Sequence, residues 1–199
     1  MKPLLTAAAL ILLVASPVAA QNAGQIASVQ RGANCPGCNL FQAALSGLER
    51  SGLNLSGARL RQADLSLSVM NRTRFSNADL RDVEAYGGVF SGSNFTGANL
   101  TNGSFVGAYL EGANFSGATL TGANFSGATL ARATGLSQSR LNQACGDEAT
   151  RLTTATPSHI LETNHYLFSG RLNFMRPFRA LVAGGGTGDA CIMLAQQLA

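Results

Sequence analysis

A strict five-residue repeat runs through the middle of the chain and limits its fold more than any other feature. Between residues 40 and 130, seventeen of the nineteen positions whose number is divisible by five hold Leu, Phe or Met. The residue two before is mostly small, as at Ala43 and Ala98, and the residue two after is Gly at eleven of the nineteen positions. The stretch ANFSGATL occurs twice without change, at 113–120 and 123–130.

This spacing excludes the common regular structures. A helix buries side chains with a period of 3.6 residues and a strand with a period of 2, so neither matches five. Leucine-rich and hexapeptide repeats also fail on spacing. A chain that turns a corner at every fifth residue does match, because Gly accepts the positive φ of a tight corner without a Cβ clash. We therefore expect a solenoid with one large and one small inward side chain per side.

The repeat resembles the pentapeptide-repeat family, whose pattern A-[DN]-L-x-x is seen here as ADLSL, ADLRD and ANLTN. The resemblance implies an all-β solenoid, a right-handed quadrilateral β-helix with four pentads per coil. The residues provide a separate check on that number, because every twentieth residue from Leu40 to Leu120 is Leu. Residues 38–132 are then expected to form about five coils, a rod on the order of 23 Å long at about 4.8 Å per layer.

Two inward positions break the pattern. Ala85 leaves space that a neighbouring side chain must fill. Burial of the Arg50 side chain without a partner would cost several kcal/mol. We expect the chain to loosen at 48–52, with Leu48 or Leu53 entering the interior instead.

The segment before the repeat is expected to serve export and capping. Lys2, an apolar stretch up to Val14 and small residues before Gln21 describe a secretory signal peptide over 1–20, cleaved near Ala20. The apolar stretch is too short to span a bilayer. The mature chain is therefore expected to be secreted or periplasmic, without a transmembrane segment. Residues 21–37 are the expected N-terminal cap.

The segment after the repeat is expected to close the solenoid. Residues 133–152 form the C-terminal cap, with a short helix from Leu136 to Gly146 in which Ser137 is the N-cap and Gly146 the stop. This segment resembles the one that closes many exported pentapeptide-repeat proteins. Residues 153–199 continue beyond that pattern as an α-containing tail, with a last helix expected at 189–198. The tail has too few apolar residues for a core of its own.

The four cysteines allow three pairings. We favour Cys35–Cys38 together with Cys145–Cys191, and export makes disulfides chemically plausible. The alternative use of the Cys35/Cys38 pair is thiol–disulfide exchange. A redox CxxC is expected at a helix start beside a βαβ unit, and no such unit is visible in the sequence.

No motif predicts catalysis, a cofactor or a metal. The two histidines, His159 and His165, lie six residues apart without a second CxxC. The glycine-rich stretch 184–189 lacks the Lys-Ser/Thr ending of a P-loop and is not a dinucleotide-binding GxGxxG. We expect no catalytic residues, no cofactor and no metal.

Coils of twenty residues also place outward side chains in columns. One set of neighbouring columns is apolar on an otherwise polar surface, and a contiguous apolar patch usually marks a contact. This candidate contact strip consists of Leu67, Val69, Tyr86, Val89, Val106 and Tyr109. The favoured occupant is the tail, residues 153–199, folded back on the strip. A homodimer or a partner protein is the second interpretation, and an incidental strip is the third.

A candidate basic patch consists of Arg59, Arg61, Arg72, Arg74 and Arg81. Arg59 is expected directly beneath Asp79, which favours a solvated ladder of ion pairs. Exposed ion pairs contribute little to stability. The alternative is a site for an anionic ligand or surface.

Charge and composition narrow the function classes. Only 12% of the residues are charged, the formal net charge is +4 and no Lys/Arg-rich run exists, so nucleic-acid binding is not expected. The expected function is that of a non-catalytic exported scaffold presenting a rigid surface to an unidentified protein or envelope partner. One alternative is a thiol–disulfide redox protein. The family resemblance suggests another, a DNA-mimic inhibitor, but DNA mimics are strongly acidic and this repeat balances Arg with acids.

Overall fold

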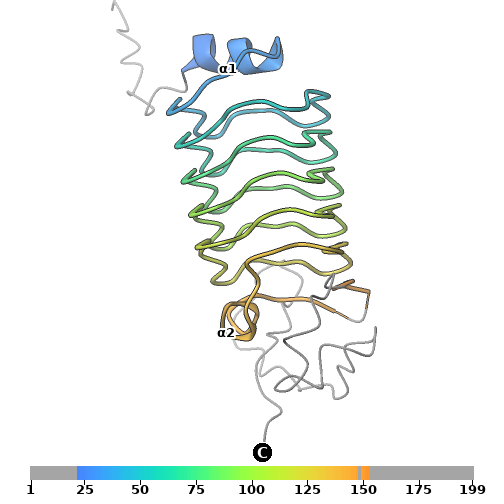
Figure 1. The fold of residues 1–199 in the computed structure, drawn as a ribbon. Coiled ribbons are helices and arrows are strands. Elements are labelled where there is room, and N and C mark those ends of the chain that lie inside the picture. Colours follow the sequence, from blue (N-terminus) through green and yellow to red (C-terminus); the bar gives the residue numbers. More distant parts are fainter. Residues whose placement is uncertain (1–21, 148, 153–199) are drawn as a thin grey trace, which may run out of the picture.

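The computed structural model describes residues 22–147 and 149–152 (Figure 1). Helix α1, Ala23–Gln30, lies across one end of a stack of similar coils, and helix α2, Gln138–Leu141, lies at the other end. The expected signal peptide, the tail, Cys191, both histidines and the 184–189 stretch lie outside the described residues. No helix of the described part is long and apolar enough to cross a bilayer.

The coils have four walls and a period of twenty residues. Parallel bridges join every fifth residue to the residue twenty positions later, from Asn39↔Arg59 to Asn114↔Thr134. Backbone bonds hold each layer on the next, as from Leu40 N to Arg59 O at 2.8 Å and from Arg59 N to Cys38 O at 2.8 Å. This confirms the predicted quadrilateral β-helix. In each pentad the bridging residue points outward, and its two neighbours point inward.

The interior is filled by the predicted columns. The five Leu of the column from Leu40 to Leu120 are at most 1% exposed. In another column the ring of Phe95 stacks between those of Phe75 and Phe115, with centroid distances of 5.0 and 5.1 Å. Burial of each such side chain stabilises the fold by about 1.5–3 kcal/mol.

The corners require positive φ, as predicted. The second corner residue has a φ between 54° and 74° in every pentad from 42 to 132, and Gly occupies most of these positions. At Gly107 and Gly112 a Cβ atom would meet nothing within 4 Å. At these two corners, conformation and not lack of space therefore accounts for Gly.

The Asn or Asp of the repeat pattern has a local structural role. Asn94 Oδ1 accepts a hydrogen bond from Thr96 N at 2.9 Å, and Asn114 Oδ1 accepts one from Ser116 N at 2.9 Å. This N–H opens the corner and points away from the layer-to-layer bonds, so an Asx side chain satisfies it locally. The same bond forms at all eight bridging positions that hold Asn or Asp, namely 39, 54, 64, 79, 94, 99, 114 and 124.

At the two irregular inward positions, 50 and 85, neighbouring apolar residues are buried in the interior. Arg50 is exposed and donates to Glu49 O at 2.7 Å, while Leu53 is 4% exposed and Leu48 packs partly buried against the core. Residues 51–52 lack the regular turn of the other corners, so the chain loosens where expected. In the pentad of Ala85, the inward position that is small in most other pentads holds Val83, and both residues are fully buried.

The N-terminal end is covered by α1. Asn22 caps the helix by accepting from Gln25 N at 3.1 Å. Gln25 Oε1 accepts from Asn39 N at 2.7 Å, and Gln30 Nε2 donates to Ala44 O at 3.1 Å. These side chains satisfy backbone groups of the first coil that would otherwise remain unpaired at an open edge.

The inward register begins earlier than residue 38, where the sequence placed the start of the repeat. Cys35 N donates to Asn54 O at 2.9 Å and Gly37 N donates to Ser56 O at 2.8 Å, as in later coils. Cys35 and Cys38 occupy inward positions with 8% and 7% exposure, and Gly37 has a φ of 68°. A disulfide joins these two cysteines across the corner, with Cα atoms 5.5 Å apart.

The C-terminal end departs from the predicted helix. Helix α2 ends at Leu141 and not at Gly146. The following residues pair with the last coil instead, as from Gly122 N to Gln143 O at 2.7 Å and from Phe125 N to Cys145 O at 2.8 Å. A longer helix would leave these edge groups without partners.

The last two bridges of the solenoid span more residues than the regular twenty. The bridges Asn124↔Cys145 and Thr129↔Arg151 span 21 and 22 residues. Asp147 Oδ1 fastens the turn between them by accepting from Gly127 N at 2.8 Å and from Thr150 N at 3.0 Å. Cys145 is disulfide-bonded, but its expected partner, Cys191, lies outside the described residues.

Candidate functional site

The structure brings the six residues of the apolar strip together. Val69 bridges Val89, and Val89 bridges Tyr109, so these three lie one above another. We call their wall, whose outward column runs from Glu49 through these three to Thr129, the strip wall. The remaining strip residues, Leu67, Tyr86 and Val106, lie at the adjacent corner in successive coils, where Leu67 N donates to Tyr86 O at 2.8 Å and Gly87 N to Val106 O at 2.9 Å.

The exposure of the strip is unusual for this molecule. Leu67, Tyr86 and Tyr109 are 61%, 57% and 54% exposed. Among the residues that the structure describes, these are the large hydrophobic side chains that are exposed, and all three belong to the strip. Apolar exposure is therefore concentrated on one edge of the rod instead of being scattered over it.

The strip wall also lacks the Asx corner bond. Its five bridging positions hold Glu, Val, Val, Tyr and Thr, whereas each of the other three walls holds at least two Asn or Asp residues at the bridging positions of 39–134. Val69, Val89 and Tyr109 thus replace the residue type that satisfies the corner N–H. Departures from a local structural rule are expected where function requires them.

Leu67 adds a second local cost. It adopts a φ of 57°, a conformation in which its Cβ is crowded, and this costs about 1–2 kcal/mol relative to Gly. Its side chain leans over the corner of the next coil, where a Cβ on Gly87 would lie 2.9 Å from Leu67 Cδ2. Gly87 leaves the room that this exposed leucine occupies.

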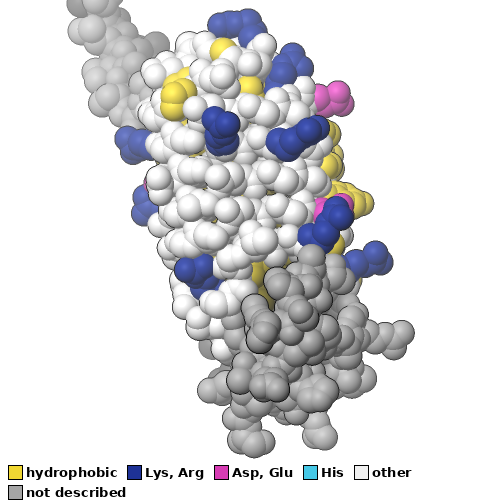
Figure 2. All heavy atoms as spheres, in the orientation of Figure 1, with side chains coloured by type: hydrophobic (Ala, Val, Ile, Leu, Met, Phe, Trp, Pro, Cys, Tyr) yellow, Lys and Arg dark blue, Asp and Glu magenta, His cyan; other side chains and the backbone are white. Residues whose placement is uncertain are grey.

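Carboxylates border the strip. Glu49 bridges Val69 at one end of the strip, and Glu84 precedes Tyr86 on the neighbouring wall; both side chains are exposed. Neither forms an ion pair within residues 22–147 and 149–152. Figure 2 shows acidic and hydrophobic side chains next to one another at one edge of the rod. The sequence reasoning missed this acidic border, although the twenty-residue columns contain the signal.

The basic patch is less compact than expected. Arg59 lies on the wall opposite the strip wall, which we call the opposite wall and whose bridging residues run from Asn39 to Thr119. Arg61 and Arg81 open the corner that follows it. Arg72 is at a corner and Arg74 is on a third wall. Figure 2 shows basic side chains separated by neutral surface.

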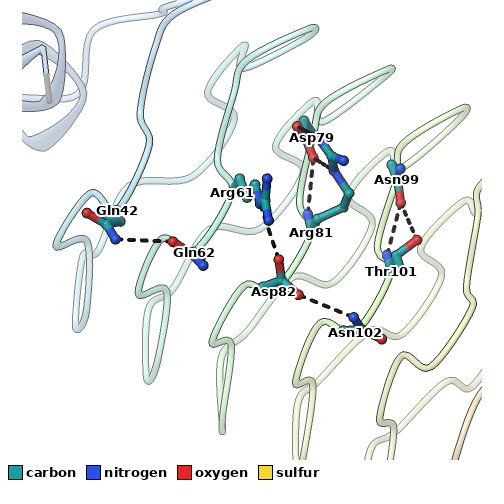
Figure 3. A network of polar contacts seen from close by, with 9 residues as sticks. All are labelled: Gln42, Arg61, Gln62, Asp79, Arg81, Asp82, Asn99, Thr101 and Asn102. Carbon is teal, nitrogen blue, oxygen red and sulfur yellow. Dashed lines mark hydrogen bonds and ion pairs between the residues drawn. The ribbon is translucent and has the colours of Figure 1, made fainter. Parts of the chain in front are cut away.

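Ion pairs occupy two of the arginines, though not in the predicted arrangement. Arg59 does bridge Asp79, but the Asp79 carboxylate binds Arg81, with Nε and Nη2 at 2.7 and 2.6 Å from its oxygens. This contact lowers the pKa of Asp79 below its ordinary value. Arg61 Nε lies 3.3 Å from Asp82 Oδ2 (Figure 3). Arg81 thus pairs with Asp79 of its own coil, and the predicted ion pair between Arg59 and Asp79 does not form.

An amide and carboxylate row follows one corner beside these pairs. Gln42 Nε2 donates to Gln62 Oε1 at 3.1 Å, and Asn102 Nδ2 donates to Asp82 Oδ1 at 3.3 Å (Figure 3). Each of these four residues has a positive φ. The bonds between coils compensate in part for the absence of Gly at this corner.

The described residues offer little that resembles a reaction centre. Within them, no group of three His, Cys, Asp or Glu side chains is placed to hold a metal ion. The Cys35–Cys38 disulfide faces the interior at the α1 end and is nearly covered. The strip is therefore the feature of the described part that best fits a functional contact.

The family comparison agrees with this fold. The family model of pentapeptide repeats matches in eight copies over residues 31–62, 51–84, 93–132 and 104–145, which together span more than half of the chain. No curated protein sequence matches it.

Several solved structures are similar. The pentapeptide repeat protein Rfr23 from the cyanobacterium Cyanothece 51142 is 23% identical, with a TM-score of 0.39 over 64% of this chain and 96% of that one. QnrB1, a plasmid-mediated fluoroquinolone resistance protein, is 24% identical, with a TM-score of 0.33 over 54% of this chain and 65% of that one. A pentapeptide repeat protein from the Arabidopsis thaliana thylakoid lumen is 22% identical, with a TM-score of 0.29 over 65% and 84%.

Proposed function

Because this chain belongs to the pentapeptide-repeat family, we propose that it is a non-catalytic solenoid scaffold that presents its apolar strip to a protein partner. The proposed setting is the periplasm or the cell exterior, after removal of residues 1–20. Rigidity suits this role, since each coil is fixed by its neighbours and the strip has a preformed shape.

One observation carries the proposal. In three successive coils the strip wall holds Val69, Val89 and Tyr109 where the repeat pattern has Asn or Asp, and the adjacent corner adds Leu67 and Tyr86 to the exposed surface. Aromatic side chains are enriched at protein interfaces because they bury much area at a small entropic cost. A polar rod has no structural need for such an edge.

A capture experiment with matched variants tests the proposal. The tagged mature protein is incubated with the envelope fraction of its host, and bound proteins are compared with those held by Tyr86→Ser/Tyr109→Ser. Phe41→Ser is the control, since Phe41 is an outward aromatic residue beyond the strip. We expect the partner to be lost with the strip variant and kept with the control. Equal capture by all three proteins, or by none, would contradict the proposal.

The thiol–disulfide alternative has weaker support. Cys35 and Cys38 take inward positions of the first coil and are nearly covered, whereas a redox pair needs an accessible sulfur. A thiol count on the native protein distinguishes the two functions. Four blocked cysteines that resist mild reductant favour the scaffold, and a readily reduced Cys35–Cys38 pair favours redox chemistry.

A further inference from the structure

The described chain ends on the strip wall. Arg151 bridges Thr129, with Leu130 N donating to Arg151 O at 2.7 Å, and Thr129 lies directly beside Tyr109 in the same column. Leu152 then packs partly buried against the core. Residues 153–199 therefore start from the wall that carries the strip.

The distance to the strip is short. Four layers separate Arg151 from Val69, about 19 Å at about 4.8 Å per layer. About six extended residues cover that distance. The remaining chain is long enough to reach every residue of the strip.

One segment of the remaining chain matches the strip in chemistry. Residues 171–179, RLNFMRPFR, interleave three arginines with Phe174, Met175 and Phe178. The strip offers apolar side chains bordered by Glu49 and Glu84, which have no ion-pair partner within the described part of the chain. Apolar contact would be complementary, and the two carboxylates would attract the arginines of the segment. Two arginines, Arg50 beside Glu49 and Arg151 on the strip wall, carry the opposite charge.

We propose that residues 171–179 dock on the apolar strip of their own chain. The inference rests on the proposed function, because it concerns the same surface, and it adds a regulation: an external partner must displace this segment. An intramolecular segment has a high effective concentration at its site, so modest contacts suffice to keep it in place.

A single tryptophan tests the docking in the full mature chain. The protein has no Trp, so Tyr109→Trp introduces one reporter on the strip and Thr119→Trp introduces one on the opposite wall. We expect the emission of Tyr109→Trp to be shifted to the blue and to be quenched less by acrylamide than that of Thr119→Trp. Tyr86→Trp is a second strip reporter in case Tyr109→Trp fails to fold.

Substitutions in the tail identify the occupant. Added to Tyr109→Trp, the pair Phe174→Ser/Phe178→Ser is expected to shift its emission to the red at every protein concentration. The control pair Ile160→Ser/Leu161→Ser lies elsewhere in the tail and is expected to leave the emission unchanged. Emission typical of an exposed tryptophan in Tyr109→Trp, or emission that Phe174→Ser/Phe178→Ser does not change, would overturn the proposal.

The outcomes also separate this inference from the proposed function. Emission that depends on protein concentration would identify a second copy as the occupant and overturn the tail docking. An exposed reporter together with capture of a partner would overturn only the docking. A covered reporter that responds to the tail, without capture of any partner, would support the docking and overturn the proposed function.

Discussion

The strip wall and the opposite wall are built from the same pentad, yet they treat their bridging positions differently. On the opposite wall, Asn39, Asp79 and Asn99 use their side chains to satisfy the next corner N–H. On the strip wall, the side chains of Val69, Val89 and Tyr109 do not accept a hydrogen bond from that N–H and face outward. The comparison indicates that the outer surface can be changed wall by wall, because the interior that supports both walls remains the same.

The largest expected effect concerns that shared interior. Phe95→Ala removes a ring that stacks on Phe75 and Phe115, and we expect a loss of about 3–5 kcal/mol in the free energy of unfolding. Tyr109→Ala removes a ring from the outside and is expected to cost under about 1 kcal/mol. Chemical denaturation followed by circular dichroism measures both. Similar losses for the two variants would show that the strip, too, supports the fold.

A second effect concerns polar groups behind the walls. Ser93 Oγ accepts from Thr73 N at 3.1 Å and donates to Met70 O at 3.0 Å, so Ser93→Ala should cost about 1–3 kcal/mol. Ser68 Oγ, behind the strip wall, is buried without a partner among the described residues. Ser68→Ala should be neutral or stabilise by up to about 1 kcal/mol. Thermal unfolding of the two variants gives the comparison, and a large loss for Ser68→Ala would reveal an unrecognised bond.

Exchanging the bridging residues of the two walls tests the comparison directly. Asn99→Tyr removes the bonds to Thr101 N at 3.0 Å and Thr101 Oγ1 at 2.6 Å, and we expect a loss of about 1 kcal/mol. Tyr109→Asn should satisfy the N–H of Glu111 and gain up to about 1 kcal/mol while it weakens partner capture. Loss of stability in both variants would contradict the role assigned to the Asx bond.

The smallest expected effect is the pH dependence that Asp79, on the opposite wall, contributes. Arg81 lowers the pKa of Asp79 below the unfolded value of 3.8. The ion pair therefore stabilises the protein above pH 3.8 and loses its effect as the pH falls through the lower folded-state pKa. As an exposed pair it contributes little to stability.

Unfolding measured between pH 2 and pH 6 for the wild type and Asp79→Asn isolates this contribution. The variant should lose part of the acid sensitivity of the wild type. Equal acid sensitivity of Asp79→Asn and the wild type would contradict the assignment.

The period of five was sufficient to predict the interior and the corners, because both depend on backbone geometry that repeats. The column rule likewise placed Val69, Val89 and Tyr109 together. It could not assign the Asp79 carboxylate to Arg81 over Arg59, since long side chains choose among several neighbours within reach. The register of Cys35 was available in the sequence, as a multiple of five followed by Gly37. The early end of α2 was not, because the unpaired edge of the last coil decides it.

The identical stretches at 113–120 and 123–130 occur ten residues apart, which is half a circuit of a twenty-residue coil. The same eight letters therefore decorate opposite sides of the rod. Gain or loss of one pentad would preserve the packed centre yet rotate everything downstream by a quarter circuit, and Tyr109 would no longer line up with Val89. Insertions or deletions should accordingly be harmless to folding in units of five, but between residues 67 and 109 they are compatible with an intact strip only in units of twenty.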